Sequence, residues 1–181
     1  MVDYDVYYES LNLFLITGQW TFLDRTLLNV SYDYRNSPLL TTENAIQGQL
    51  VSTIGDLLNI FNKDQVEDLA EDRTAVSKTF SIGLSKPISD NYQISGDVRV
   101  SKLEGTEASG GVAANPSTDT EFDYTAQFTG FNIIKQGDLA LVTLNYAQLT
   151  NSDSTTVTFN TRYPFSRAFR INPRLRLRHR D

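Results

Sequence analysis

Apolar and polar positions alternate along most of the chain. In the segments 76–84, 92–100, 122–128 and 140–146, sixteen of the eighteen even positions are apolar, and the exceptions are Lys78 and Gly96. The odd positions of these segments are mostly Ser, Thr, Asn, Gln and Gly, with a few charged residues. A period of two places successive side chains on opposite faces of a strand. The pattern therefore predicts strands that have one apolar and one polar face.

The same alternation extends the predicted sheet to about nine strands. It recurs in 28–34, 157–165 and 169–177, while 11–22 is apolar on both faces and 2–8 resembles a short leading strand. We expect most of these strands to be nine to eleven residues long, which is the length of a tilted strand that crosses a membrane. Ordinary strands are nearer five or six residues long. We therefore expect an all-β fold, an antiparallel up-and-down meander of about 8–10 strands that forms a transmembrane outer-membrane β-barrel or part of one.

The predicted connections alternate in length. Short turns rich in Asp, Asn, Gly, Pro and Ser fall at 23–25, 87–91, 135–138 and 164–167, whereas the links expected at 35–74, 103–120 and 149–153 are longer. We expect a single barrel domain or fragment over 1–181, with a flexible external loop at 103–120. The 35–74 link would be a partly helical loop, either external or plugging the barrel. Within it, one helix could start at Thr42 and run to Phe61, and Asp64 with Glu67 resembles the capping box of a second.

The composition of the two faces distinguishes a membrane barrel from a soluble one. Exposed strands of soluble proteins usually carry many Lys and Glu, but this chain has five Lys, and three of them fall in predicted loops or turns. Aromatic residues also gather near the strand ends, where a membrane barrel carries its two girdles. The candidate girdle residues are Tyr32, Tyr34, Tyr92, Phe122, Tyr124, Tyr146, Tyr163 and Phe165. The alternative is a soluble β-barrel or sandwich that binds an apolar ligand or a protein partner.

Few residues of this chain suit catalysis. It has no Cys and one His, His179, close to its end, so thiol chemistry is excluded and a His-dependent mechanism is improbable. The acidic clusters do not match the spacing of a calcium loop, and the glycines form no phosphate-binding motif. We therefore expect no catalytic residue, no cofactor and no metal site, and a function that is not enzymatic.

Charge is unevenly distributed along the chain. Residues 1–72 carry twelve acidic and three basic side chains, whereas 162–180 carries seven Arg and no acid. Because Arg174 and Arg176 alternate with leucines, they fall on one face of a predicted strand, and lumenal Arg side chains favour anions. The candidate lumen-lining residues are Asp97, Arg99, Asp123, Gln127, Asn145, Asn160, Arg162, Arg170, Arg174 and Arg176.

Two interpretations of these arginines are open. They could attract a passing polyanion such as an acidic polysaccharide, or they could form internal ion pairs with lumenal acids such as Asp33, Asp97 and Asp123. Nucleic acid is not an expected partner, because an alternating strand explains the basic stretch.

Three segments resemble a known family. They are Val30 to Gln49 (VSYDYRNSPLLTTENAIQGQ), Asp72 to Pro87 (DRTAVSKTFSIGLSKP) and Asn160 to Pro164 (NTRYP). They are similar to segments of bacterial exported proteins in which tetratricopeptide repeats precede a C-terminal outer-membrane β-barrel. The resemblance covers residues 26–181 and includes no catalytic residue. This chain lacks the helical repeats and a terminal aromatic strand, so we expect a fragment of a larger barrel.

The resemblance implies a location and partners. It predicts a protein of the bacterial outer membrane that serves as a pore, translocator or membrane anchor. The implied partners are outer-membrane lipid, a tetratricopeptide-repeat region and an exported polymer.

Overall fold

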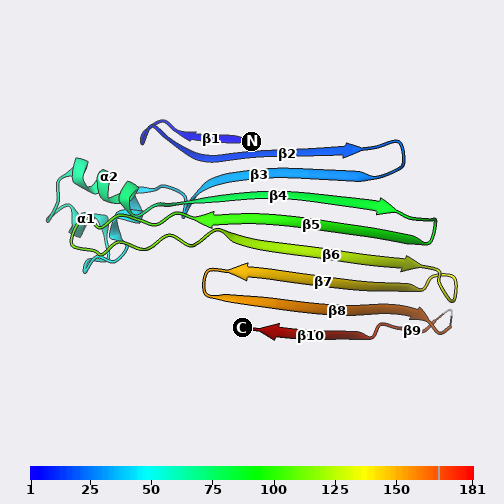
Figure 1. The fold of residues 1–181 in the computed structure, drawn as a ribbon. Helices are drawn as coiled ribbons and strands as arrows, with labels where there is room; N and C mark the ends of the chain where they lie inside the picture. The colour runs from blue at the N-terminus through cyan, green and yellow to red at the C-terminus, as the bar shows by residue number, and fades with distance from the viewer. Residues whose placement is uncertain (167) are drawn as a thin grey trace. The chain divides into compact units, whose positions relative to one another are not determined.

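The fold is an antiparallel β meander, as the alternation predicted. The computed structural model describes residues 1–166 and 168–181. Neighbouring strands pair in the order β1-β2-β3-β4-β5-β6-β7-β8-β10, and the short β9 pairs with β8 (Figure 1). The strands are β1 (Val2–Asp5), β2 (Ser10–Thr21), β3 (Leu27–Ser37), β4 (Ala75–Pro87), β5 (Tyr92–Leu103), β6 (Glu121–Phe131), β7 (Leu139–Leu149), β8 (Ser152–Pro164), β9 (Arg170–Ile171) and β10 (Arg174–Arg180).

The last predicted strand differs from the observed one. The sequence pattern predicted a single strand over 169–177, but the structure divides it into β9 and β10, with Asn172 and Pro173 between them. Proline has no N–H to donate to a strand ladder, and here its carbonyl accepts a hydrogen bond of 3.0 Å from the Thr161 amide. Of the turn predicted at 164–167, Arg167 lies outside the described residues.

The chain divides into two compact units. The first comprises Met1–Ile16, Tyr32–Thr79 and Ser101–Asp119, and the second comprises Thr17–Ser31, Phe80–Val100 and Thr120–Asp181. The first unit contains all the described helices: the 3-10 helix η1 (Thr42–Ile46) and the α-helices α1 (Ile54–Leu57) and α2 (Lys63–Asp72). We call residues 38–74 the helical insertion.

The helical insertion is partly helical, as predicted, but its helices have other boundaries. The helix expected from Thr42 stops at Ile46, and Gly48 then adopts φ +77°, outside the helical region. A Cβ at Gly48 would approach the Val112 side chain to 2.6 Å, so this turn requires glycine. The capping box predicted at Asp64 and Glu67 is formed instead by Asn62 and Gln65, two residues earlier.

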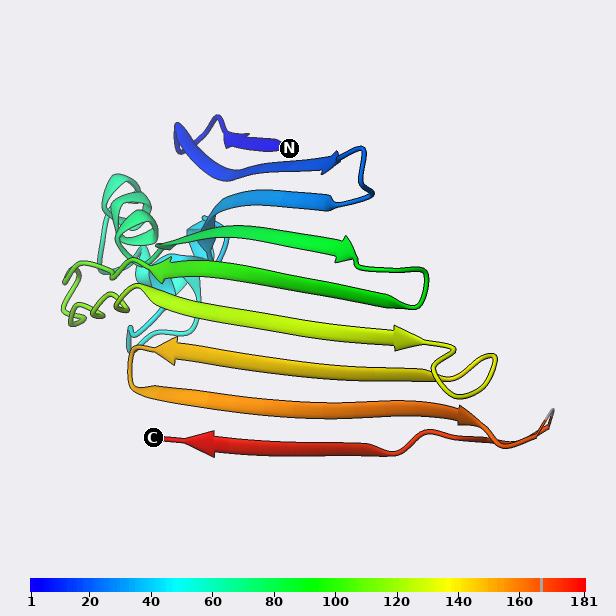
Figure 2. The ribbon, with the colours of Figure 1, turned by 45° about the vertical axis from the view of Figure 1, so that its right-hand side comes forward.

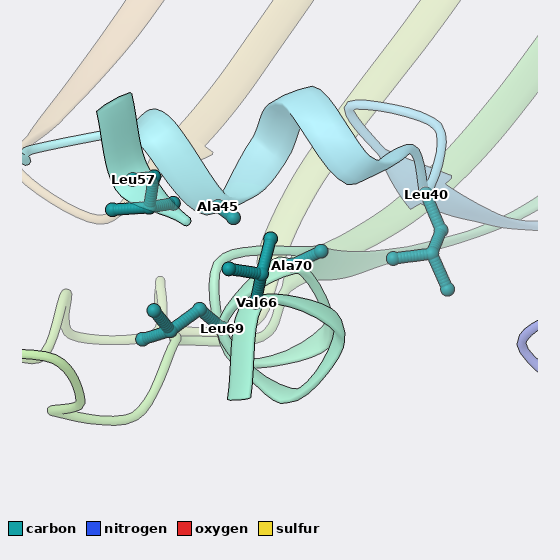
Figure 3. Close-up of a cluster of buried hydrophobic side chains, with 6 residues drawn as sticks. All are labelled: Leu40, Ala45, Leu57, Val66, Leu69 and Ala70. Carbon is teal, nitrogen blue, oxygen red and sulfur yellow. The ribbon is translucent and has the colours of Figure 1, made fainter. Parts of the chain in front are cut away.

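The helical insertion contains an ordinary hydrophobic core. Leu57 and Val66 are completely buried there, and Tyr8 and Phe61 pack against the cluster from its edge. Figure 3 shows Leu57 of α1 and Ala45 of η1 beside Val66 and Ala70 of α2. The buried members are Leu40, Ala45, Leu57, Val66, Leu69 and Ala70. In this unit, therefore, apolar side chains leave water by packing on one another.

The second unit ends in four long paired strands, which we call the four-strand sheet: β6, β7, β8 and β10. They lie side by side in both ribbon views (Figure 2), and their register is continuous over most of their length. Phe128 is opposite Val142, which is opposite Phe159, which is opposite Leu175. Because the register places the apolar positions of each strand opposite apolar positions of the next, the sheet has one apolar and one polar face.

Candidate functional site

The polar face of the four-strand sheet is a regular lattice of side chains. Its rows across β6, β7, β8 and β10 are Asp123-Ala147-Ser154-Arg180, Thr125-Asn145-Thr156-Arg178, Gln127-Thr143-Thr158-Arg176 and Thr129-Leu141-Asn160-Arg174. Every row ends in an arginine. We call Arg174, Arg176, Arg178 and Arg180 the arginine row.

Burial in this sheet is the reverse of burial in an ordinary soluble sheet. On β8, Thr156 and Thr158 are 9% and 7% exposed, whereas Val157 and Phe159 are 39% and 43% exposed. Large apolar side chains of the neighbouring strands are exposed in the same way: Tyr124, Phe128, Val142, Leu144, Tyr146, Leu175 and Leu177. We call this exposed apolar surface of the four-strand sheet the apolar belt. Contiguous exposed apolar patches normally mark a surface that contacts a protein, a ligand or a membrane.

Aromatic rings border the apolar belt. At one border, Tyr124 stacks on Tyr146 with ring centroids 6.2 Å apart, and Phe122 stacks on Tyr124 at 6.1 Å. The Tyr146 hydroxyl donates a 2.9 Å hydrogen bond to the Asp153 carboxylate, so the apolar surface gives way to polar groups there. Rings with one apolar and one polar end suit the boundary between an apolar medium and water.

The other candidate girdle residues fall into further groups. Tyr92 stacks on Phe128 at 5.7 Å, and Phe165 contacts Phe169 edge-on at 6.4 Å, both near the ends of strands in the second unit. Tyr163 lies on β8 opposite Ile171. In the first unit, Tyr32 contacts Phe14 at 6.3 Å. The structure therefore places all eight near strand ends or in aromatic pairs, and their role at a lipid boundary stays a prediction.

Lys78 is the charged exception on the apolar face of the predicted sheet. The structure pairs its ammonium with the Glu104 carboxylate and places it 5.8 Å from the centre of the Tyr34 ring. Tyr34 is itself a candidate girdle residue. A lysine beside an aromatic ring and an acid at the end of a strand is the arrangement expected of a snorkelling side chain.

Most of the predicted lumen-lining residues share one face. Asp123, Gln127, Asn145, Asn160, Arg174 and Arg176 all belong to the polar lattice, and Arg162 follows Asn160 with the same parity on β8. Asp97 and Arg99 line an open polar groove of about 650 Å³ together with Gly18, Ser31 and Gly83. Arg170 is different, because it lies on β9 in a pocket with Lys135 and Gly137.

The arginine row has no acidic partners within residues 1–166 and 168–181. None of its guanidiniums forms an ion pair there, although Arg180 donates a 3.1 Å hydrogen bond to the Ser152 hydroxyl. Two of the acids proposed as partners have other contacts: Asp33 pairs with Arg35, and Asp123 accepts a 2.9 Å hydrogen bond from Asn145. The internal ion pairs considered from the sequence are therefore absent from the described structure.

Charged and polar contacts also hold the helical insertion in place. The alternation of apolar and polar positions in the sequence did not predict these contacts. The Arg73 guanidinium is buried and donates to the carbonyls of Glu107 and Ser109. Gln49 donates a 3.0 Å hydrogen bond to the Gly110 carbonyl. These contacts join the insertion to the 104–119 loop, so the two long links of the first unit form one packed structure.

Two adjacent tyrosines attach the β1–β2 connection to the same insertion. The Tyr8 hydroxyl lies 2.8 Å from the Thr42 hydroxyl, and the Tyr7 hydroxyl donates to Glu67. The Tyr7 hydrogen bond lowers the pKa of Glu67, whereas partial burial beside other acids raises the pKa of Glu71. A pair of neighbouring tyrosines is a weak sequence signal, because its partners lie 34 and 60 residues away.

Comparison with known proteins assigns this chain to no family. No protein-family model, curated protein sequence or solved structure matches the chain. Among the described residues, no helix has the length and apolar character needed to cross a membrane. The assignment of function therefore rests on the two faces of the sheet.

Proposed function

We propose that this protein is an outer-membrane β-barrel, or a part of one, that acts as a pore, translocator or membrane anchor without catalytic chemistry. The observation that carries the proposal is the reversed burial on β8, where threonines are buried and Val157 and Phe159 are exposed. A membrane barrel has this distribution, since its apolar residues face lipid and its polar residues face the lumen. The location proposed is the bacterial outer membrane, and lipid is the first partner.

Strand length supports the same proposal. The long strands β2 to β8 contain 11 to 13 residues, and a tilted strand of about 9–11 residues crosses a bilayer. In lipid every backbone N–H and C=O must be hydrogen-bonded within the protein. The proposal therefore includes pairing partners for β1 and β10, the two ends of the strand order, either through closure or through further strands. A tetratricopeptide-repeat region, implied by the family resemblance, is the proposed soluble partner.

One feature favours the alternative of a soluble protein that binds an apolar ligand. The exposed face carries an open groove of about 400 Å³ lined mainly by apolar side chains, among them Leu28, Leu84 and Leu144. A groove of this size could hold a small apolar molecule. In that case the chain would be monomeric in plain buffer, with the rest of the apolar face in water or against a protein.

Refolding in two media separates these functions. The chain is refolded into detergent and, separately, into plain buffer, and each sample is examined by gel migration with and without boiling and by far-UV circular dichroism. The membrane proposal expects a β spectrum in detergent with a shift between boiled and unboiled bands, and aggregation in buffer. A monodisperse β-structured monomer in plain buffer would overturn it and support the soluble alternative.

A further inference from the structure

We infer that the arginine row is a binding site for a linear acidic polysaccharide. This inference rests on the proposed function, because it takes the polar face of the four-strand sheet to be the side that an exported polymer contacts. Its own evidence is independent of the membrane: four exposed guanidiniums at alternate positions of one strand, Arg174 to Arg180.

The charges of the row are not neutralised by β8, the strand that pairs with β10 in the described structure. Each arginine is opposite Ser154, Thr156, Thr158 or Asn160 on β8, and none of these side chains is charged. The nearest acid in the lattice, Asp123, lies three strands away on β6, which is about 14 Å at ordinary strand spacing. Asp123 is already bound to Asn145. Four like charges on one strand repel one another, so an external anion would stabilise the row.

The spacing of the row favours a polymer over a single small anion. Alternate residues of an antiparallel strand are about 6.8 Å apart, so a small carboxylate would contact one or two guanidiniums of Arg174 to Arg180. A chain with a carboxylate on successive units could contact all four. Each guanidinium can hold a carboxylate through two parallel N–H donors. Repeated weak contacts along one polymer then combine into useful affinity.

The chemistry around the row favours a polysaccharide over a nucleic acid. Proteins that hold single strands stack the bases on aromatic side chains, but the aromatic residues of β8, Phe159 and Tyr163, have the opposite parity to Thr158 and Asn160. The four lattice rows that end in the arginine row contain hydroxyl and amide groups and no aromatic ring. Hydroxyls and amides can exchange hydrogen bonds with a hydroxyl-rich polymer.

The test uses the full chain refolded in detergent, with fluorescent alginate oligosaccharide, a linear polyuronate, as the probe. The row variant replaces Arg174, Arg176, Arg178 and Arg180 with Gln. The matched control removes four other positive charges by Arg25→Gln, Lys86→Gln, Lys102→Gln and Lys135→Gln, at residues outside the candidate lumen-lining set. We expect the row variant to lose affinity about tenfold or more, given four exposed ion pairs, and its binding to become less sensitive to salt. The control should stay within about twofold.

Other outcomes would overturn the inference. Equal losses in the row variant and the control would mean that net charge, not the row, attracts the polymer. Tighter binding of a single-stranded oligonucleotide than of alginate at the same salt concentration would mean that the arginine row is a nucleic-acid site and not a polysaccharide site. A second variant with Lys at the four positions keeps the charge but loses the paired donors, so an intermediate affinity is expected. Heat-dependent gel migration of every sample shows separately whether the barrel has folded. A folded barrel that does not bind alginate would therefore refute the polysaccharide site and leave the proposed function standing.

Discussion

The helical insertion and the four-strand sheet distribute their apolar and polar side chains in opposite ways. In the insertion, Leu57 and Val66 are buried against other side chains of the same unit. In the sheet, Leu144 and Phe159 are exposed, while Thr156 and Thr158 are buried. The insertion encloses its apolar side chains, whereas the sheet encloses threonines and leaves large apolar side chains exposed. The proposed membrane barrel would account for this difference, because it gives the apolar face of the sheet an apolar surrounding.

The largest expected effect is in the core of the helical insertion. Leu57→Ala should destabilise the insertion by about 2–5 kcal/mol, because it leaves a cavity where the leucine is fully enclosed. Urea titration followed by limited proteolysis within 38–74 measures the change. Leu50→Ala is the matched control, since Leu50 is fully exposed, and it should stay within about 0.5 kcal/mol. Equal effects of the two substitutions would mean that the insertion has no specific core.

A similar loss is expected in the sheet, but only in an apolar medium. Leu144→Arg should cost about 2–4 kcal/mol when the protein is folded in a bilayer, as for an arginine at the midplane of a barrel's lipid face. The measurement is denaturant titration in lipid vesicles, with heat-dependent gel migration as the readout. Thr143→Arg places the same charge on the polar face and is the control, which should change stability much less. If Leu144→Arg is harmless and increases solubility in buffer, the apolar belt faces water and the comparison fails.

A smaller effect is expected at the start of α2. Asn62→Ala should cost about 1 kcal/mol, because it removes the side chain that caps the helix. The Asn62 Oδ1 accepts a 2.9 Å hydrogen bond from the Gln65 backbone N–H, and the Gln65 Oε1 accepts one of 3.0 Å from the Asn62 backbone N–H. Asp64→Ala should cost less, since Asp64 contributes only charge near the helix start. Amide exchange within Lys63–Asp72 measures both, and a larger effect of Asp64→Ala would favour the cap predicted from the sequence.

The contrast between Asn62 and Asp64 also shows what sequence patterns can predict. Strand positions and faces follow from parity alone, because the period of two is a local property of the backbone, so the meander and the polar face were predictable. Strand boundaries were less predictable: the strand expected over 169–177 is interrupted near Pro173, which lacks an N–H. The partners of charged groups were not predictable, since they depend on register and long loops. Arg73 donates to carbonyls 34 and 36 residues away, and Lys78 forms an ion pair with Glu104.

The smallest expected effect concerns the turn between β6 and β7, where a carboxylate organises the backbone. Asp138 accepts hydrogen bonds of 2.7, 2.7 and 2.9 Å from the amides of Ile133, Ile134 and Lys135. Burial alone would raise the pKa of Asp138, but these three donors hold it below the ordinary value. A lowered pKa in the folded state gives stability that is complete above about pH 4 and is lost as the pH falls through the folded value.

Acidification should therefore loosen this turn while the neighbouring strands stay paired. Protection factors of the three amides, measured at pH 6 and at pH 3, should fall at the lower pH, and Asp138→Ala should show the low value at both. The four-strand sheet serves as the internal reference, because its Thr143 and Thr158 face each other through backbone pairing that does not titrate. Unchanged protection of Ile133 and Ile134 at pH 3 would mean that the backbone alone determines the turn. A parallel loss in the strands would mean that the turn and the sheet unfold as one cooperative structure.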